Sequence, residues 1–346
     1  MKKRVILGMS GGLDSSVSAY LLIEKGFEVI GITMKFSGAS RCCSEKDICD
    51  AKKVAQKLGF QHYTIDVTQL FSKKVIQYFI DSYTRGKTPN PCAVCNRKVK
   101  FQILFREAKE LNAKFVATGH YARIKKIGNY HYLFRSLDIK KDQSYFLARL
   151  KRDWLSEILF PVGKYTKEKI SKIASDADLP FYKKDESQEV CFISENNYRN
   201  FLSKKFLKLS KPGKIIDKSG KVLGEHKGIF YYTIGQRKGI QVDINIPLYV
   251  ISINPEENTI TVGEKGDVQK RFFIAEGINW LVYPNNIPTR VSVKIRSQHK
   301  AQTADINLKG TRAFITFDKP QMAITPGQLA VLYRDKMVLG SGWITE

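Results

Sequence analysis

Hydrophobic and polar positions in the first third of the chain follow two alternating patterns. Four short segments are predicted to be strands, namely Val5–Gly8, Glu28–Met34, His62–Asp66 and Phe115–Thr118. Segments with helical spacing lie between and beside them, near residues 15–25, 47–58, 69–84 and 96–111. This alternation predicts a parallel sheet with right-handed crossovers, and such sheets bind ligands at the carboxyl ends of their strands.

The pattern changes twice farther along the chain. Tyr121–Ile127 and Tyr130–Arg135 are predicted to be the two arms of a hairpin. Residues 153–205 have helical spacing again, including Lys167–Ala177. After Pro212-Gly213 the spacing becomes strand-like, so we expect strands to dominate the rest of the chain.

Two further hairpins are predicted, at Lys214–Gly224 with a Ser-Gly turn and at Tyr249–Gly263. From about residue 270 nearly every segment is strand-like, with strands near 312–318, 329–334 and 337–344 and with apolar residues alternating with polar ones at Val291, Val293 and Ile295. We therefore expect an α/β fold: a parallel-sheet domain at 1–205, a small β-rich central domain at 206–268, and a C-terminal β-barrel at 269–346.

The turn after the first strand carries the most specific signal, the sequence SGGLDS at residues 10–15. Glycines allow a tight turn whose N–H groups converge on an anion, and the following helix adds partial positive charge at its N-terminus. The motif is neither a Walker loop nor a dinucleotide fingerprint. It resembles the PP-loop of ATP pyrophosphatases. Asp14 is expected to position Mg²⁺ or the loop, the alternative being a helix cap.

Composition narrows the class of partner. The 346 residues carry a formal net charge of +25, which suits nucleic acid, although an evenly lysine-rich surface would give the same total. No run of about 18 apolar residues occurs, so no membrane span is expected. The basic N-terminus leads directly into the first strand, which argues against a signal peptide. We expect a cytoplasmic protein.

Six cysteines in such a protein point to reactivity or metal binding. Cys92 and Cys95 form a C-x-x-C pair just before the helix expected from Asn96, where a thiol is more easily deprotonated. The pair alone does not distinguish a redox pair, metal ligands and a nucleophile. Cys191 is either a core residue or a reactive one. Cys42, Cys43 and Cys49 have poor spacing for zinc and are expected to be bystanders.

Taken together, the motifs resemble those of the tRNA-specific 2-thiouridylase family, nearly from end to end. The matching segments are Gly8–Ser16, Gly31–Lys35, Thr88–Pro91, Cys95-Asn96, Ala117–Tyr121, Lys141–Phe146, Cys191–Ile193, Gly235–Gly239 and Thr325–Gln328. The resemblance implies a Rossmann-like PP-loop domain of the adenine nucleotide alpha hydrolase type, followed by the central domain and a tRNA-binding barrel.

The resemblance also implies a reaction. ATP adenylates the oxygen on carbon 2 of the wobble uridine in tRNA for Lys, Glu and Gln, a cysteine persulfide delivers sulfur, and AMP and pyrophosphate are released. Cys95 is implied as the nucleophile and Cys191 as the persulfide carrier, and the two can form a disulfide. The implied sulfur donor is a cysteine desulfurase, acting directly or through a relay protein. ATP and Mg²⁺ are the implied cofactors.

The remaining implied roles fall into two sets. The residues expected to contact ATP are Gly8, Met9, Ser10, Gly11, Gly12, Leu13, Asp14, Ser15, Met34 and Gly119. Those expected to contact the target base or tRNA are Asn90, Pro91, Cys92, His120, Lys141, Asp142, Gln143, Arg296, Ser297 and Gln328.

One departure from the family leaves alternatives open. The family often has Asp, assigned to acid/base work, where this chain has Cys92. Cys92, Cys95 and Cys191 are therefore also candidate ligands of a 4Fe–4S cluster in a cluster-dependent tRNA thiolase. Two other functions are weighed against thiolation: a PP-loop ligase or amidotransferase acting on a small metabolite, and a non-catalytic RNA-binding protein.

Overall fold

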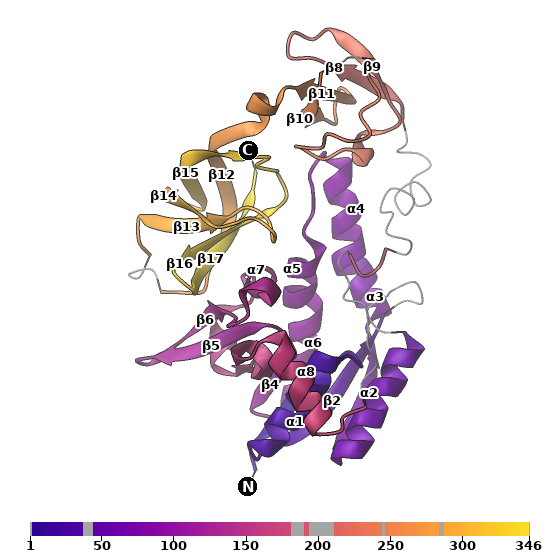
Figure 1. The fold of residues 1–346 in the computed structure, drawn as a ribbon, viewed down its shortest axis with the longest axis vertical. Coiled ribbons are helices and arrows are strands. Elements are labelled where there is room, and N and C mark those ends of the chain that lie inside the picture. The colour runs from indigo at the N-terminus through magenta and orange to yellow at the C-terminus, as the bar shows by residue number, and fades with distance from the viewer. Residues whose placement is uncertain are drawn as a thin grey trace.

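The computed structural model describes residues 2–36, 44–180, 190–193, 211–243, 246–283 and 287–345. Figure 1 shows the N-terminal α/β part at one end of the molecule and a small central sheet at the other, with a barrel beside them. Helix α4 (Gln77–Thr84) runs from the α/β part toward the central sheet.

The N-terminal sheet has five parallel strands in the order β3-β2-β1-β4-β7. Their bounds are β1 Arg4–Met9, β2 Glu28–Lys35, β3 Gln61–Asp66, β4 Phe115–Thr118 and β7 Ile158–Leu159. Val5, Ile6 and Leu7 of β1 are fully buried, as expected of a strand covered on both faces. The predicted strands and the parallel sheet are confirmed, and β1 ends where the glycine-rich turn begins.

The helices of this part cover both faces of the sheet. They are α1 (Leu13–Glu24), α2 (Glu45–Leu58), α3 (Thr68–Phe71) with a π-helical turn leading into α4, and a second continuous run of α5 (Pro91–Cys95), a π-helical turn (Asn96–Lys100) and α6 (Phe101–Glu110). The prediction that the helix starts near Asn96 is wrong. Asn90 caps it by accepting from Ala93 N at 3.2 Å, and Pro91 suits the first position, so Cys92 and Cys95 lie inside the helix.

The prediction of helix throughout residues 153–205 is also partly wrong. Helix α8 (Lys167–Asp176) is confirmed, but 3₁₀ turns at Arg152–Ser156 and Pro161–Lys164 flank strand β7. A side chain at Gly163 would meet Ala122 O, so this segment is shaped by a close backbone approach. Residues 181–189 and 194–205 lie outside the described residues.

The central sheet has the order β10-β11-β8-β9. Its strands are β8 Gly213–Ile216, β9 Val222–His226, β10 Tyr249–Asn254 and β11 Thr259–Gly263. Both predicted hairpins are confirmed, and a parallel pairing of β11 with β8 joins them. Ile215, Val250 and Ile260 are fully buried in its core.

The C-terminal part is a closed antiparallel barrel. Its strands are β12 Gln269–Trp280, β13 Arg290–Lys294, β14 Gln302–Lys309, β15 Arg312–Met322, β16 Leu329–Arg334 and β17 Met337–Ile344, and pairing of β12 with β17 closes it. Val291, Val293 and Ile295 point into its core, as the alternation predicts. The hairpin β5 (Ala122–Ile127) and β6 (Tyr130–Arg135) extends this sheet through Phe134 and Met337. The predicted fold class is confirmed.

Among the described residues, no helix is long and apolar enough to cross a membrane.

Candidate nucleotide and cysteine site

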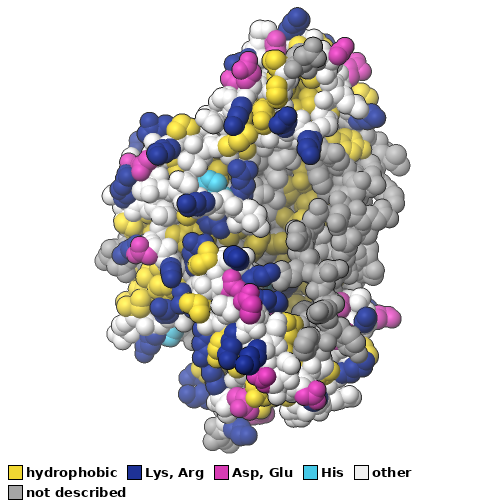
Figure 2. Space-filling view, in the orientation of Figure 1, with side chains coloured by type: hydrophobic (Ala, Val, Ile, Leu, Met, Phe, Trp, Pro, Cys, Tyr) yellow, Lys and Arg dark blue, Asp and Glu magenta, His cyan; other side chains and the backbone are white. Residues whose placement is uncertain are grey.

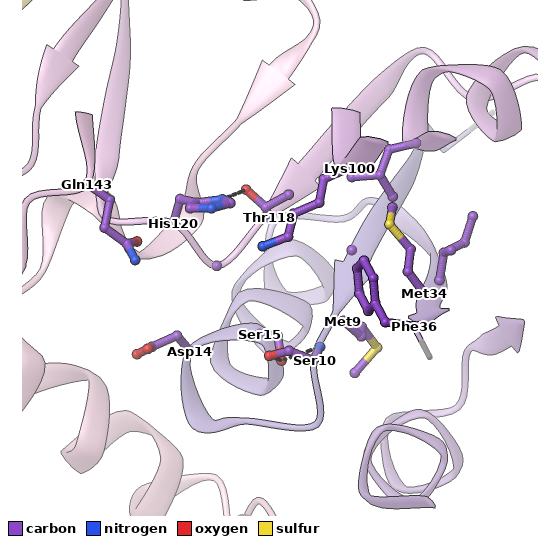
Figure 3. Close-up of a pocket in the computed structure, with 14 residues that line it drawn as sticks. Met9, Ser10, Asp14, Ser15, Met34, Phe36, Lys100, Thr118, His120 and Gln143 are labelled. Atoms are coloured by element: carbon purple, nitrogen blue, oxygen red, sulfur yellow. Dashed lines mark hydrogen bonds between the residues drawn. The ribbon is translucent and has the colours of Figure 1, made fainter. Parts of the chain in front are cut away.

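A cavity of about 240 Å³ opens at the carboxyl ends of β1, β2 and β4. Figure 3 shows the side chains around it. It is lined by Gly8, Met9, Ser10, Asp14, Ser15, Ile32, Met34, Phe36, Lys100, Leu104, Thr118, Gly119, His120 and Gln143. Seven residues expected to contact ATP are in this lining, whereas Gly11, Gly12 and Leu13 are in the turn beside it.

The cavity has an apolar side and a polar side. Met9, Met34 and Phe36 gather on one side, and Ser10, Ser15 and Asp14 lie at the start of α1 on the other (Figure 3). The Lys100 side chain reaches into the space above the serines. An apolar slot next to serines and an ammonium suits a ligand with a flat base at one end and phosphates at the other.

The turn that forms the polar side is held by its own residues. Gly11 has φ +67°, and a Cβ there would lie 2.3 Å from Asp47 O. Ser15 Oγ accepts from Ser10 N at 3.3 Å and donates to Gly12 O at 2.9 Å. Gly12 is the N-cap of α1 and provides no capping side chain, so the start of α1 faces the cavity with backbone donors.

Asp14 does not cap the helix, because the N-cap position belongs to Gly12. Its Oδ1 accepts from Tyr121 Oη at 2.8 Å, and both of its oxygens accept from Lys167 Nζ, at 2.8 and 2.9 Å. The hypothesis of a helix cap is therefore wrong, and the carboxylate joins α1 to α8 and to Tyr121 at the edge of the cavity.

His120 lies in the wall of the same cavity. Its Nδ1 is 2.7 Å from Thr118 Oγ1, and its ring is stacked against Phe101. Burial of the ring, with a smaller effect of the Lys100 charge, lowers the pKa of His120 to about 3. The imidazole is therefore neutral at physiological pH and acts as a hydrogen-bonding group rather than a cation. Its expected contact with tRNA stays a prediction.

Lys100 and Leu104, which line the cavity, lie on the same helix run, residues 91–110, as Cys92 and Cys95. Cys95 is 6% exposed, and Cys92 and Cys191 are partly exposed. Cys95 and Cys191 pack in one apolar cluster, in which Phe192 makes edge contacts with Phe71 and Phe79. The fold thus brings into one cluster two cysteines that are 96 positions apart in the sequence.

Within the described ranges, no group of three His, Cys, Asp or Glu side chains is arranged to hold a metal ion. Cys49 is exposed on α2, and Cys42 and Cys43 lie outside the described residues.

The barrel contacts one side of the helix run of residues 91–110, the cysteine helix, and the residues just before it. Gln328 Nε2 donates to Pro89 O at 2.9 Å and to Thr88 O at 3.3 Å, and Thr88 N donates to Pro326 O at 2.9 Å. Asn90, the cap of the helix, follows directly. We call these contacts, together with those of Asn279 described next, the barrel seam.

Asn279 of β12 makes the second half of the barrel seam. It accepts from Arg97 Nη1 at 2.7 Å and donates to Ala148 O and Leu150 O, at 3.1 and 2.8 Å. Arg97 lies in the π-helical turn directly after Cys95. The position of the cysteine helix therefore depends on residues of the barrel.

The other residues expected to contact tRNA differ in exposure. The Asp142 carboxylate is 2% exposed and accepts from Arg135 Nε at 3.0 Å and Ser144 Oγ at 2.9 Å. Gln143 lines the cavity and accepts from Tyr121 N. Arg296 is exposed on the barrel, and Lys141 and Ser297 are partly buried. Figure 2 shows Lys and Arg side chains scattered over the coloured part of the visible face.

Three models of known protein families together match almost the whole chain. Residues 3–195 match the family model described as the tRNA methyl transferase HUP domain, 199–264 the tRNA methyl transferase PRC-barrel domain, and 270–344 the Aminomethyltransferase beta-barrel domain. The tRNA-specific 2-thiouridylase MnmA 1 of Caldanaerobacter subterraneus subsp. tengcongensis is 46% identical, with 100% of this chain and 99% of the relative covered. The MnmA protein of Clostridioides difficile is 42% identical at the same coverage.

The chain belongs to the tRNA-specific 2-thiouridylase family.

Two solved structures that resemble part of this chain share less of its sequence. The tRNA thiolase NcsA of Methanococcus maripaludis, solved with its 4Fe–4S cluster, is 22% identical with a TM-score of 0.38, covering 59% of this chain and 67% of that one. A 4-thiouridine synthetase–RNA complex with bound ATP is 16% identical with a TM-score of 0.35, covering 51% and 40%.

Several residues of the site were missed by sequence reasoning, among them Phe36, Lys100, Tyr121 and Lys167. Lys100 was assigned only to a helix, Tyr121 only to a motif and a hairpin, and Lys167 only to a helical pattern. A lysine at the first position of a predicted helix is a weak signal, because it opposes the helix dipole and so suggests an external partner.

Proposed function

We propose that this protein is an ATP-dependent tRNA uridine 2-sulfurtransferase. The observation that supports this most is the continuous helix run of residues 91–110, which carries Cys92 and Cys95 at one end and lines the nucleotide cavity with Lys100 and Leu104. One rigid element thus links an ATP site to a thiol site. Membership of a family whose curated members are named as thiouridylases supports the same activity.

ATP is proposed to bind with its base against Met34 and Phe36 and with its phosphates at the SGGLDS turn. The backbone donors of the turn and the start of α1 bind the phosphates, and Lys100 adds positive charge. These groups orient the α-phosphorus toward the oxygen on carbon 2 of the uridine, which is adenylated as pyrophosphate leaves.

Mg²⁺ takes oxygen ligands, and in the described cavity lining the carboxylate that could supply them is Asp14. Mg²⁺ would neutralise charge on the triphosphate there.

Sulfur transfer is proposed to use two thiols. The terminal sulfur of a Cys191 persulfide attacks carbon 2 and displaces AMP. The Cys95 thiolate then attacks Cys191 Sγ, which breaks the sulfur–sulfur bond, leaves 2-thiouridine on the tRNA and forms a Cys95–Cys191 disulfide for a later thiol reductant. Cys95 belongs to a large apolar cluster and Cys191 packs against the same cluster, and their direct pairing is part of the proposal. Cys92 has no transfer role in this scheme.

The cluster-dependent alternative is less well supported. The described side chains include no group of three arranged as metal ligands, so no step is assigned to a cluster. We propose tRNA for Lys, Glu and Gln as substrates and a cysteine desulfurase, directly or through a relay protein, as the sulfur donor. Because the proposed substrate is tRNA, we infer that the protein works in the cytoplasm.

Cysteine variants test the function and the mechanism together. Wild-type protein, ATP, a persulfide donor and unmodified tRNA should yield 2-thiouridine by nucleoside analysis and AMP by thin-layer detection. Cys95→Ser and Cys191→Ser should each stop 2-thiouridine formation. Cys92→Ser should retain measurable activity, and Cys49→Ser, which removes an exposed thiol on α2, is the matched control.

An inactive Cys92→Ser variant, together with about four irons per chain after anaerobic purification, would establish the cluster mechanism instead. AMP release that tRNA does not stimulate would favour a ligase acting on a small metabolite. The absence of AMP release would favour a non-catalytic RNA-binding protein.

A further inference from the structure

Lys167 makes an ion pair at the edge of the nucleotide cavity that no part of the proposed chemistry yet uses. Its Nζ lies 2.8 and 2.9 Å from the two oxygens of Asp14, which lines the cavity. The side chains of Lys167 and Asp14 are 24% and 32% exposed, so water and ligands reach the pair. Tyr121 Oη donates to Asp14 Oδ1 at 2.8 Å and holds the carboxylate from a second direction.

Helix stability does not explain this lysine. Lys167 is the first residue of α8, capped by Thr166, and a cation in the first turn opposes the helix dipole. Instead, α8 is packed against α1 through Ile170, Ala174 and Val17, and this packing directs its start toward the cavity. The ammonium is therefore placed by tertiary structure beside the SGGLDS turn.

The charge at this edge matters for a polyphosphate. Of the described residues that line the cavity, Asp14 is the only acid, and unpaired it would repel the terminal phosphates of ATP. Lys167 neutralises it in the ligand-free protein. The lysine has a flexible four-carbon stem and three donors, so it can turn toward a phosphate oxygen while Tyr121 still holds Asp14.

We propose that Lys167 is a ligand of the terminal phosphates of ATP, and of the pyrophosphate that leaves, and that Asp14 holds it ready in the ligand-free protein. This rests on the proposed ATP-dependent function. It makes Lys167 specific for the part of the nucleotide that AMP lacks.

Equilibrium binding of ATP, inorganic pyrophosphate and AMP, with a chelator present to remove divalent metal, tests the assignment. Lys167→Met should weaken ATP and pyrophosphate binding by roughly tenfold to a hundredfold, the loss of one charge-assisted hydrogen bond, and leave AMP binding unchanged. Lys167→Arg should retain most of the affinity. Lys169→Met, an exposed lysine on the same helix, is the matched control and should bind all three ligands normally.

A double variant separates contact from charge balance. If Lys167 touches the phosphates, Lys167→Met with Asp14→Asn still binds pyrophosphate about tenfold or more weakly than Asp14→Asn alone. Equal pyrophosphate binding by the double variant and by Asp14→Asn alone would overturn the inference, since Lys167 would then only neutralise Asp14. Equal weakening of AMP and ATP would overturn it too, as a purely structural effect. If wild-type protein binds ATP, these failures leave the proposed function intact; if wild-type protein binds no ATP, the proposed function itself fails.

Discussion

The nucleotide cavity and the cysteine helix are built in different ways, although they share residues 91–110. The cavity is lined by residues at the strand ends of the N-terminal sheet and on the helices that cover it, all of them between positions 8 and 143 of the sequence. The cysteine helix is held by barrel residues more than 180 positions later in the sequence, Asn279 and Gln328. All residues that line the cavity come from the N-terminal part of the chain, whereas the cysteine helix and the residues before it also make hydrogen bonds to the barrel.

This difference implies that the two halves of the proposed reaction respond to different damage. Adenylation should depend on the SGGLDS turn and be tolerant of changes at the barrel seam. Sulfur transfer should depend on both, because an adenylated uridine must meet a correctly placed thiol. The three predictions that follow test this separation.

The largest effect is expected from Gly11→Val. The residue has φ +67°, and a Cβ there would lie 2.3 Å from the Asp47 backbone oxygen, so the turn cannot keep its shape. AMP formation should be abolished while tRNA binding, which uses other surfaces, is largely retained. Thin-layer detection of AMP from labelled ATP and a filter-binding assay with tRNA measure the two properties.

The matched control is Gly266→Val, at a glycine without positive φ and with no neighbour within 4 Å of its added Cβ. Adenylation near the wild-type rate in Gly11→Val would mean that the turn does not bind phosphate.

A smaller and more selective effect is expected from Asn279→Ala. The change removes three hydrogen bonds of the barrel seam, one of them donated by the Arg97 guanidinium, and should lower the free energy of unfolding by roughly 2–4 kcal/mol. We expect 2-thiouridine formation to fall about tenfold while AMP formation stays near normal, because the helix carrying Cys95 loses its support.

Asn307→Ala, on an exposed position of β14, is the control for a change in the barrel away from the seam. An equal fall of both activities in Asn279→Ala would contradict the separation of the two sites.

The smallest effect is expected from Arg296→Ala, on the exposed surface of the barrel. If Arg296 contacts tRNA phosphate, its loss should weaken binding of every tRNA a few-fold and reduce the slope of log affinity against log salt by about one. ATP affinity should not change. Arg312→Ala, whose guanidinium is paired with Glu276, should leave the slope unaltered.

A tRNA affinity that does not change between about 50 and 200 mM salt would remove the nucleic-acid interpretation of the +25 charge.

Much of this fold could be predicted because its signals are local. Buried runs such as Val5–Gly8 and the alternation at Val291, Val293 and Ile295 reflect what each segment buries, so strands and their faces follow from the pattern. The SGGLDS turn is likewise a local backbone geometry that only glycine at position 11 allows. The predicted start of the cysteine helix near Asn96 is wrong, because Thr88–Pro91 is also typical of a turn, whereas Asn90 caps a helix that begins at Pro91.

The sequence by itself determined the class of most of the described segments, the glycine-rich turn and the cysteines available for chemistry. Only the tertiary structure decided which distant residues meet: Lys167 with Asp14, and Gln328 with Thr88 and Pro89. The physical reason is that local patterns record whether a side chain is buried, whereas a partner far away in the sequence is chosen by how whole helices and strands pack.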